Sequence, residues 1–224
     1  MSGLAKFFGY LFTGQLGKIA SALAERTPLW LYHRWDAALF ETTLSGPGPE
    51  PALPPGYHCR VAETGDLGAL SQVIGLPLNT YQTRFETGDF CFAVFEGKRP
   101  ANLNWIHLGP CYVRGAGYTL EAEPDDAYIY GIYTDPSERG KGLYKKCLMH
   151  LANDLFARGS RRLIQMVENG NEPVWHTLPQ LGYQRTVSLK HRRFCGIMYT
   201  RWTDASGRVQ RRWFCSEPKG IFPI

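Results

Sequence analysis

The chain has 224 residues, of which 44% are hydrophobic and 20% charged, and its formal net charge is +5. This composition excludes a disordered chain, a collagen-like chain and a simple coiled coil, and the length suits one good-sized domain or two small ones. Positive charge is concentrated in residues 184–219, which hold nine Lys or Arg against two Asp or Glu. The rest of the chain is therefore slightly acidic, and its body is not a polycation.

The first 25 residues carry an apolar stripe at helical spacing, formed by Leu4, Phe7, Phe8, Leu11, Phe12, Leu16, Ile19 and Leu23. We predict an amphipathic helix that docks on the domain or on a partner subunit, so a homodimer stays open. A membrane-surface helix and a signal peptide are the two alternatives. The sequence has no run of 18 apolar residues, so no membrane-spanning helix is predicted.

The six cysteines form no CxxC pair and no Cys/His pair at zinc-binding spacing. No metal site is therefore predicted. A core of this size does not need disulfides, so we interpret the cysteines as reduced thiols of a cytoplasmic protein.

The elements predicted before residue 127 are strands and two helices. An extended, aromatic-rich stretch at Thr27–Leu44 is followed by a linker at Ser45–Gly56 that contains five prolines. Strands are predicted at Tyr57–Ala62, Phe90–Phe95 and Asn102–Leu108, and helices at Leu67–Ile74 and around Thr80–Thr87. Gly109–Asp126 is a long connection, and connections of this length are often functional.

The elements predicted after residue 126 begin with a strand at Ala127–Thr134 and a helix at Leu143–Arg158. A strand at Arg162–Val167, a short helix from Asn171 to Gly182 and a strand at Tyr183–Leu189 follow. A β-hairpin surrounds the turn at Asp204–Gly207. This order predicts an α+β fold with a mixed sheet. We divide the chain into residues 1–55 (helix, extended segment and linker), 56–196 (core) and 197–224 (hairpin and tail).

The most informative segment joins the strand ending at Thr134 to the helix beginning at Leu143. It contains the glycine-rich sequence Arg139-Gly140-Lys141-Gly142. Such a turn presents consecutive backbone N–H groups at a helix N-terminus, where glycines let a pyrophosphate approach the backbone closely. Arg139 and Lys141 add positive charge. The segment predicts a phosphate cradle, and the alternative is an ordinary glycine-rich turn.

The sequence YTDPSERGKGLYKKCL, which starts at Tyr133, resembles the acetyl-CoA-binding motif of the GNAT N-acyltransferases, Q/R-x-x-G-x-G/A. Arg139 and Gly142 match its first and fourth positions, whereas Tyr144 stands where the motif has Gly or Ala. Downstream, the sequence from Asn171 to Tyr183 is similar to the family's Asn-led helix that ends in leucine, glycine and an aromatic residue. Together the two segments extend the resemblance over about residues 57–196.

The resemblance implies a mostly antiparallel sheet flanked by helices, with acetyl-CoA as the acyl donor. The strand end Ile132-Tyr133-Thr134 is expected to separate from the strand at Arg162–Val167. Acetyl-CoA would enter that gap, and main-chain groups of Ile132 and Thr134 would pair with its pantetheine arm. The expected pyrophosphate site comprises Arg139, Gly140, Lys141, Gly142, Leu143 and Tyr144. Asn171 would bind the pantetheine arm, cap its helix, or do both.

The residues for proton transfer do not follow the family pattern. Many relatives carry a Glu at the position of Tyr130 and a Tyr at the position of Leu178. Our candidate catalytic residues are Tyr130 and His176, because both side chains can carry a proton. Glu121 and Glu123 on the long connection are further candidates, and a water relay without an essential side chain is the remaining alternative.

The basic hairpin near the C-terminus alternates arginines with aromatic residues. A strand with one buried and one solvated face gives this pattern, and we favour that explanation. A wall for an anionic acceptor or for the CoA 3′-phosphate is the second interpretation. Nucleic-acid binding is the least favoured, and we predict no nucleic-acid partner.

The sequence therefore predicts a cytoplasmic N-acetyltransferase that moves an acetyl group from acetyl-CoA to a primary amine of a small molecule. The acceptor is predicted to be an amino sugar or an amino-acid derivative. Three alternatives stay open: an acyltransferase for longer chains from CoA or a carrier protein, a protein acetyltransferase, and an inactive CoA-binding regulatory module.

Overall fold

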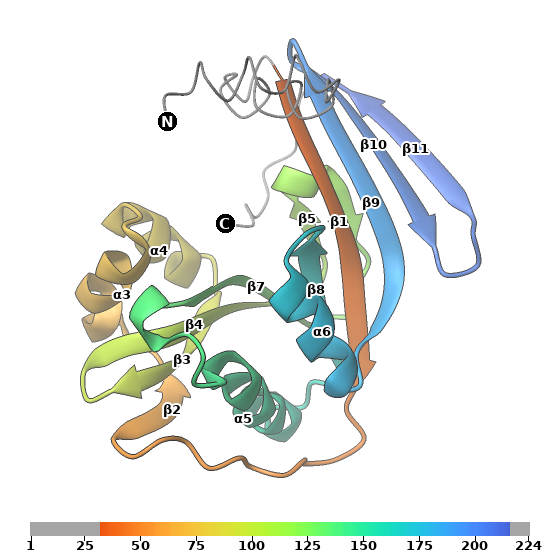
Figure 1. Cartoon of the computed structure of the whole chain (residues 1–224). Helices are drawn as coiled ribbons and strands as arrows, with labels where there is room; N and C mark the ends of the chain where they lie inside the picture. Colours follow the sequence, from red (N-terminus) through yellow and green to blue (C-terminus); the bar gives the residue numbers. More distant parts are fainter. Residues whose placement is uncertain (1–31, 216–224) are drawn as a thin grey trace, which may run out of the picture.

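The structure is a computed structural model that describes residues 32–215 (Figure 1). The helix predicted within residues 1–25 lies outside the described residues. The extended stretch predicted at Thr27–Leu44 is a long strand, β1 (Tyr32–Thr43), over its described part. None of the helices within residues 32–215 is long and apolar enough to cross a membrane.

The remaining elements follow the predicted order closely. The helices are α3 (Leu67–Ile74), α4 (Leu78–Glu86), α5 (Leu143–Ala157) and α6 (Glu172–Gln180). The strands are β2 (Tyr57–Val61), β3 (Phe90–Glu96), β4 (Arg99–Leu108), β5 (Cys111–Val113), β6 (Tyr118–Leu120), β7 (Ala127–Thr134), β8 (Arg162–Glu168), β9 (Gln184–Phe194), β10 (Ile197–Asp204) and β11 (Val209–Phe214).

Nine strands form one sheet in the order β11-β10-β9-β1-β8-β7-β4-β3-β2. Neighbouring strands are antiparallel except β7 and β8, which are parallel. The predicted α+β class with a mixed, mostly antiparallel sheet is therefore confirmed. The predicted C-terminal hairpin is β10–β11, which extends the same sheet at one edge.

Helices cover both faces of the sheet at its β2–β8 end (Figure 1). The apolar stripe of α5, including Leu148 and Leu151, packs on one face with Leu178 of α6. Leu70 of α3 and Tyr81 of α4 pack on the other face around Trp105, which is fully buried. Because strand residues alternate between faces, each strand of this region contributes to both cores.

The central position of β1 is not predicted by the sequence pattern. β1 pairs antiparallel with β8 on one side and β9 on the other. Its residues Ala37, Ala38, Leu39 and Phe40 are buried in succession, as expected for a strand covered on both faces. The division at residues 55 and 196 stays a prediction, and strands from all three segments share the sheet.

The long connection predicted at Gly109–Asp126 has structure of its own. It folds into a two-stranded hairpin, β5–β6, joined by a short 3₁₀ turn. Val113 and Leu120 of this hairpin are buried in the core on the α3/α4 face. The connection therefore covers the sheet, and Glu121 and Glu123 lie at exposed positions beyond it.

β7 contains a bulge at Gly131. The pairing of β4 with β7 shifts register between Leu103 and Trp105, where β7 contributes the extra residue. Gly131 lies at this bulge with a φ of +54°. A Cβ built on Gly131 would lie 3.0 Å from Arg84 Nη1 and 3.2 Å from Trp105 Cδ1. Glycine is required there by both backbone conformation and packing.

We expect Gly131→Ala to lower the free energy of unfolding by about 2–4 kcal/mol, because the left-handed φ and the overpacking each contribute. Gly97→Ala is the matched control, since Gly97 has a φ of +57° with open space around it. We expect it to cost only about 1 kcal/mol. Urea unfolding of both variants measures the difference, and equal losses would show that packing at the bulge is not tight.

Candidate functional site

The parallel strands β7 and β8 separate near the middle of the sheet. Their ladder contains only three pairs and ends at Ile129 and Gln165. Beyond that point β7 stays with β4, because Leu103 pairs with Tyr133 and the Asn102 side-chain amide donates to the Tyr133 carbonyl at 3.0 Å. The gap predicted between the two strand ends is therefore present.

The main chain of β7 faces this gap at alternate residues. Since the Tyr133 carbonyl points to β4, the N–H and C=O groups of Ile132 and Thr134 point to the opposite side, toward β8. These are the two residues expected to offer main-chain groups to a ligand. The structure thus leaves open strand positions where the sequence places them.

A cleft of about 650 Å³ lies at the gap and continues over the N-terminus of α5. Nine of the ten predicted binding residues line it, namely Ile132, Tyr133, Thr134, Arg139, Gly140, Gly142, Leu143, Tyr144 and Asn171. Lys141 does not. The cleft also has five lining residues that the sequence analysis missed: Glu138, Lys145, Pro173, Val174 and Thr177. Lys145 follows Gly142 by one helical turn, and this spacing is the signal that could have identified it.

The backbone over the cleft presents a run of open amides. Gly140 and Gly142 have φ values of +82° and +69°, and a Cβ on either would meet no atom within 4 Å. Among the described residues, the backbone N–H groups from Gly140 to Lys145 have no recorded acceptor, and the first helical bond is Lys146 N–H to Gly142 O at 3.1 Å. Six consecutive donors at a helix N-terminus suit a phosphate group.

Tyr144 explains the departure from the family motif. Its hydroxyl donates to Gln165 Oε1 of β8 at 2.8 Å, so the side chain bridges the first turn of α5 and the far strand of the gap. Burial raises the pKa of Tyr144 well above its usual value, which keeps the phenol neutral. A larger residue than Gly or Ala thus fits here because it contacts β8.

Glu138 holds the loop in place through three partners. Its carboxylate accepts from the Tyr57 hydroxyl at 2.6 Å and from Lys141 Nζ at 2.8 Å, and it is ion-paired with Arg99. Lys141 also reaches the Tyr57 hydroxyl at 2.8 Å. The hydrogen bond from Lys141, with those from Tyr57 and Arg99, lowers the pKa of Glu138 to about 2. Lys141 is therefore engaged within the loop.

The cations that remain at the cleft are Arg139 and Lys145. Arg139 is exposed and its Nε lies 3.4 Å from the Thr134 carbonyl. Lys145 donates to Gln180 Oε1 of α6 at 2.9 Å and has no carboxylate partner within 4 Å in the described residues. Both groups can move their charge toward an anion without breaking an ion pair.

Asn171 occupies the N-cap position of α6 without a side-chain cap bond. Its carbonyl accepts from the Val174 and Trp175 amides at 3.1 and 3.0 Å, so the backbone alone begins the helix. No hydrogen bond is recorded for the Asn171 side chain among residues 32–215, and the residue lines the cleft. The side-chain capping role is therefore absent, and the side chain is free to bind a ligand.

The structure does not bring the two candidate catalytic residues together. Tyr130 is buried on the α3/α4 face, and its hydroxyl donates to Asp89, which also lies 2.7 Å from His107 Nδ1. Burial and then the Asp89 charge raise the pKa of Tyr130 strongly. His176 lies on the exposed side of α6, where its side chain is 80% exposed and lies 3.6 Å from Glu172. Neither residue lines the cleft.

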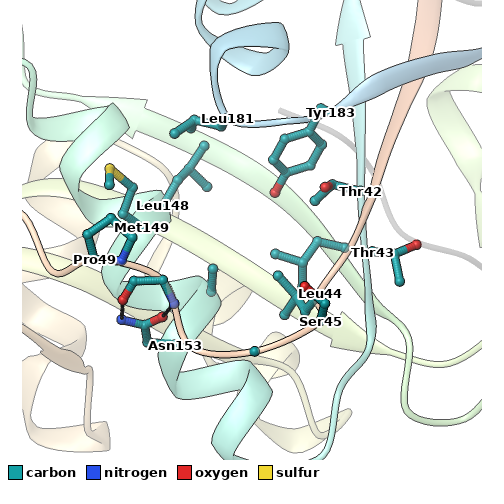
Figure 2. A pocket seen from close by; sticks show the side chains of 14 residues that line it. Thr42, Thr43, Leu44, Ser45, Pro49, Leu148, Met149, Asn153, Leu181 and Tyr183 are labelled. Atoms are coloured by element: carbon teal, nitrogen blue, oxygen red, sulfur yellow. Dashed lines mark hydrogen bonds between the residues drawn. The ribbon is translucent and has the colours of Figure 1, made fainter.

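A second, smaller cavity of about 240 Å³ lies between α5 and the linker that follows β1 (Figure 2). Asn153 holds the linker over it by accepting from the Gly48 amide at 2.8 Å and donating to the Gly48 carbonyl at 3.0 Å. Leu148, Leu44 and Tyr183 line it. It contains none of the predicted site residues, so the cleft at the gap is the candidate site. Within residues 32–215 no group of three His, Cys, Asp or Glu is placed to hold a metal.

The fold and the cleft can be compared with those of known protein families. Residues 78–183 match the family model described as "Acetyltransferase (GNAT) family". This region of the chain, residues 78–183, is therefore similar to the GNAT acetyltransferases. No curated protein sequence matches the chain.

Three solved structures similar to this chain are described as GNAT or GCN5-related acetyltransferases. A GCN5-related N-acetyltransferase from Sphaerobacter thermophilus has a TM-score of 0.54 and 15% identity, over 79% of this chain and 56% of that one. A putative GNAT acetyltransferase from Novosphingobium aromaticivorans has a TM-score of 0.50 and 16% identity, over 70% and 63%. One from Colwellia psychrerythraea has a TM-score of 0.50 and 16% identity, over 69% and 53%. The chain thus spans about half to two thirds of each of these structures, and the likeness shows the fold.

The ion-pair network of Glu138 leads to a prediction about acid stability. A carboxyl whose folded pKa is about 2, against 4.5 for the free group, stabilises the fold above the higher value and loses that contribution as the pH falls toward the lower one. We expect Glu138→Gln to lower the melting temperature near neutral pH, and this deficit to shrink between about pH 5 and pH 2.

Glu172→Gln is the control, because it removes a carboxylate that is 74% exposed on α6. We expect it to change the melting temperature little at any pH. Thermal unfolding followed by circular dichroism across this range measures both variants. A deficit for Glu138→Gln that stays constant down to about pH 2 would contradict the lowered pKa.

Proposed function

We propose that the chain transfers an acetyl group from acetyl-CoA to a primary amine of a small molecule. The observation that carries this proposal is the run of six open amides, Gly140 to Lys145, at one end of a cleft that begins where β7 leaves β8. CoA has an anionic head and an extended arm. The open amides suit the head, and the gap between the strands suits the arm. The family supports the same chemistry.

We propose that the open amides hold the pyrophosphate, because they form a positive end of the α5 dipole that needs no side-chain charge. Arg139 and Lys145 add charge at the rim. Lys141 contributes indirectly, by fixing Glu138 and hence the loop. The backbone thus supplies most of the recognition, which suits a cofactor fragment shared by all CoA thioesters.

The pantetheine arm would lie along the open side of β7. Main-chain groups of Ile132 and Thr134 face the gap and can form strand-like hydrogen bonds with its two amides. The Asn171 side chain stands on the opposite wall as a further donor and acceptor. Bound in this way, the arm would be ordered and its thioester would lie near the Gly131 bulge.

Direct transfer forms an amide bond to the acceptor nitrogen while the thioester C–S bond breaks. The acceptor amine loses a proton, and the departing thiolate gains one. A main-chain N–H of β7 aimed at the gap can stabilise the negative charge that develops on the thioester oxygen. Tyr130 and His176 remain predictions for proton transfer, and the positions of both favour a water relay instead.

We further propose an amino sugar or amino-acid derivative as the acceptor and a cytoplasmic location. The six cysteines are all free thiols, which suits a reducing compartment. We propose residues 56–196 as the catalytic core, because every residue that lines the cleft belongs to it. β1 and β10–β11 then extend the sheet of that core.

Two variants at one position test the cradle. Gly142→Asp places a carboxylate beside the pyrophosphate site, whereas Gly142→Asn has nearly the same shape and also tolerates a positive φ. We expect the Asp variant to bind acetyl-CoA on the order of 100-fold more weakly than the Asn variant, because like charges repel at close range. Isothermal titration calorimetry measures both. Equal affinities would refute the cradle.

The activity itself is tested by incubating the protein with acetyl-CoA and a panel of amines, with mass spectrometry of the products. The panel includes amino sugars, amino acids and lysine peptides, and parallel reactions contain longer acyl-CoA thioesters. We expect acetylated small amines, with none formed by Gly142→Asp. Acylation of peptides only, transfer of long chains only, or binding without turnover would each refute the proposal.

Tyr130→Phe tests the role of the buried phenol. Because Tyr130 donates to Asp89 and does not line the cleft, we expect a loss of about 1–3 kcal/mol in stability. We expect kcat to fall less than about 10-fold, whereas a residue that transfers a proton contributes 100-fold or more. Tyr128→Phe, which alters the ring stacked on Tyr130, is the control. Steady-state kinetics with the best acceptor decide between the two roles.

A further inference from the structure

The outer three strands, β9 to β11, carry most of the exposed apolar surface of the described chain. Six large hydrophobic side chains within residues 32–215 are exposed, and four of them lie here: Phe194, Ile197, Val209 and Trp213. Phe194 is 64% and Trp213 is 69% exposed. These strands project from the end of the sheet that the helices leave bare (Figure 1). Such a cluster on one element indicates an interaction surface.

Strand register places these residues in ordered rows on one face. Phe194 pairs with Ile197 at the β9–β10 turn, and Arg192, Tyr199 and Trp213 are opposite one another in the next row. Lys190, Arg201 and Arg211 form the row after that. The rings of Tyr199 and Trp213 lie 4.5 Å apart, which confirms that they share a face. We call the Phe194, Ile197, Arg192, Tyr199, Trp213, Lys190, Arg201 and Arg211 surface the wing face.

The cationic row of the wing face is costly unless an anion covers it. Lys190 is opposite Arg201, and Arg201 is opposite Arg211, so like charges meet directly across two strand pairs. Such pairs destabilise a sheet. Within the described residues, none of these three has a carboxylate within 4 Å, because the nearby Asp36 is taken by Arg34 and Arg192. Folding alone therefore gives no reason for this row.

We propose that the wing face docks the protein on an anionic lipid surface, with the β9–β10 turn inserted first. Rows on a strand are about 7 Å apart, since each residue advances about 3.3 Å. With Phe194 and Ile197 at the acyl boundary, the Arg192–Tyr199–Trp213 row lies among the headgroups, whose layer is about 5–8 Å deep. Trp and Tyr favour that layer. The Lys190–Arg201–Arg211 row then faces the charged surface from about 13 Å, within reach of its field.

The order of the rows favours lipid over the other polyanions. Nucleic acids are bound by aromatic rings interleaved with cations, whereas here Phe194 and Ile197 lie at the turn beyond the cations, and Ile197 has no ring to stack on a base. A second copy of this chain would bring like charges together in a symmetric contact. Residue Tyr32, where β1 begins, pairs with Phe194. Phe194 therefore lies at the end of the sheet where β1 begins.

The test is co-sedimentation of the full chain with vesicles of phosphatidylcholine alone and of equal parts phosphatidylcholine and phosphatidylglycerol. We expect binding to the anionic vesicles. The triple variant Lys190→Gln, Arg201→Gln, Arg211→Gln should bind on the order of 100-fold more weakly, since each cation near such a surface contributes about fivefold. Phe194→Ser with Ile197→Ser should weaken binding about 10-fold or more.

The matched control is Lys98→Gln, Arg158→Gln, Arg161→Gln, which removes equal charge at exposed sites away from the wing face. We expect it to bind like the unchanged chain, and thermal unfolding verifies that every variant folds. Equal weakening by the two triple variants would overturn the proposal, as would equal binding to neutral vesicles. Binding of single-stranded DNA without vesicle binding would also overturn it, and so would a dimer, seen by light scattering, that Phe194→Ser with Ile197→Ser dissociates.

Discussion

The site depends on one constraint: past Ile129, β7 can form strand hydrogen bonds with only one neighbour. The bulge at Gly131 reverses the side to which the main chain points, and Asn102 then ties the end of β7 to β4. β8 continues along β1 instead, pairing with it from Arg162 to Glu168. β7 and β8 therefore pair with each other near their N-terminal ends, whereas near their C-terminal ends β7 pairs with β4 and β8 pairs with β1. The gap between them is what an extended ligand can fill as an additional strand.

The loop after β7 makes that gap suitable for an anion, because its charged side chains pair with one another and its backbone amides stay open. Glu138 gathers Lys141, Arg99 and Tyr57 around one buried carboxylate, so the loop is held to β2 and β4. Two basic side chains are thereby held in ion pairs beside the cleft. The charge left for a ligand comes chiefly from backbone amides, which are fixed in direction by Gly140 and Gly142. Amide dipoles held in advance need no reorganisation when an anion binds.

Apolar periodicity and turn residues predict most elements from Tyr57 onward, because these depend on local patterns of burial. Local patterns do not specify partners far apart in sequence: β1 pairs with β8 across more than 100 residues, and only packing selects that position. The β5–β6 hairpin is missed because its strands have three residues each. In the site, the glycines in the sequence are enough to predict the cradle. The pairing of Lys141 with Glu138 is not predicted, because it depends on Tyr57 and Arg99, which lie on other strands.

The same distinction bears on catalysis. The sequence position where many relatives carry a Glu holds Tyr130, and by itself this suggests that a carboxylate has been lost. In the folded chain the Tyr130 hydroxyl donates to Asp89, which precedes β3 and also contacts His107. A buried carboxylate is therefore present on the α3/α4 face, supplied by the connection between α4 and β3. Because neither Tyr130 nor Asp89 lines the cleft, this carboxylate does not stand in for the missing Glu at the proposed acceptor site, and its contacts there are structural.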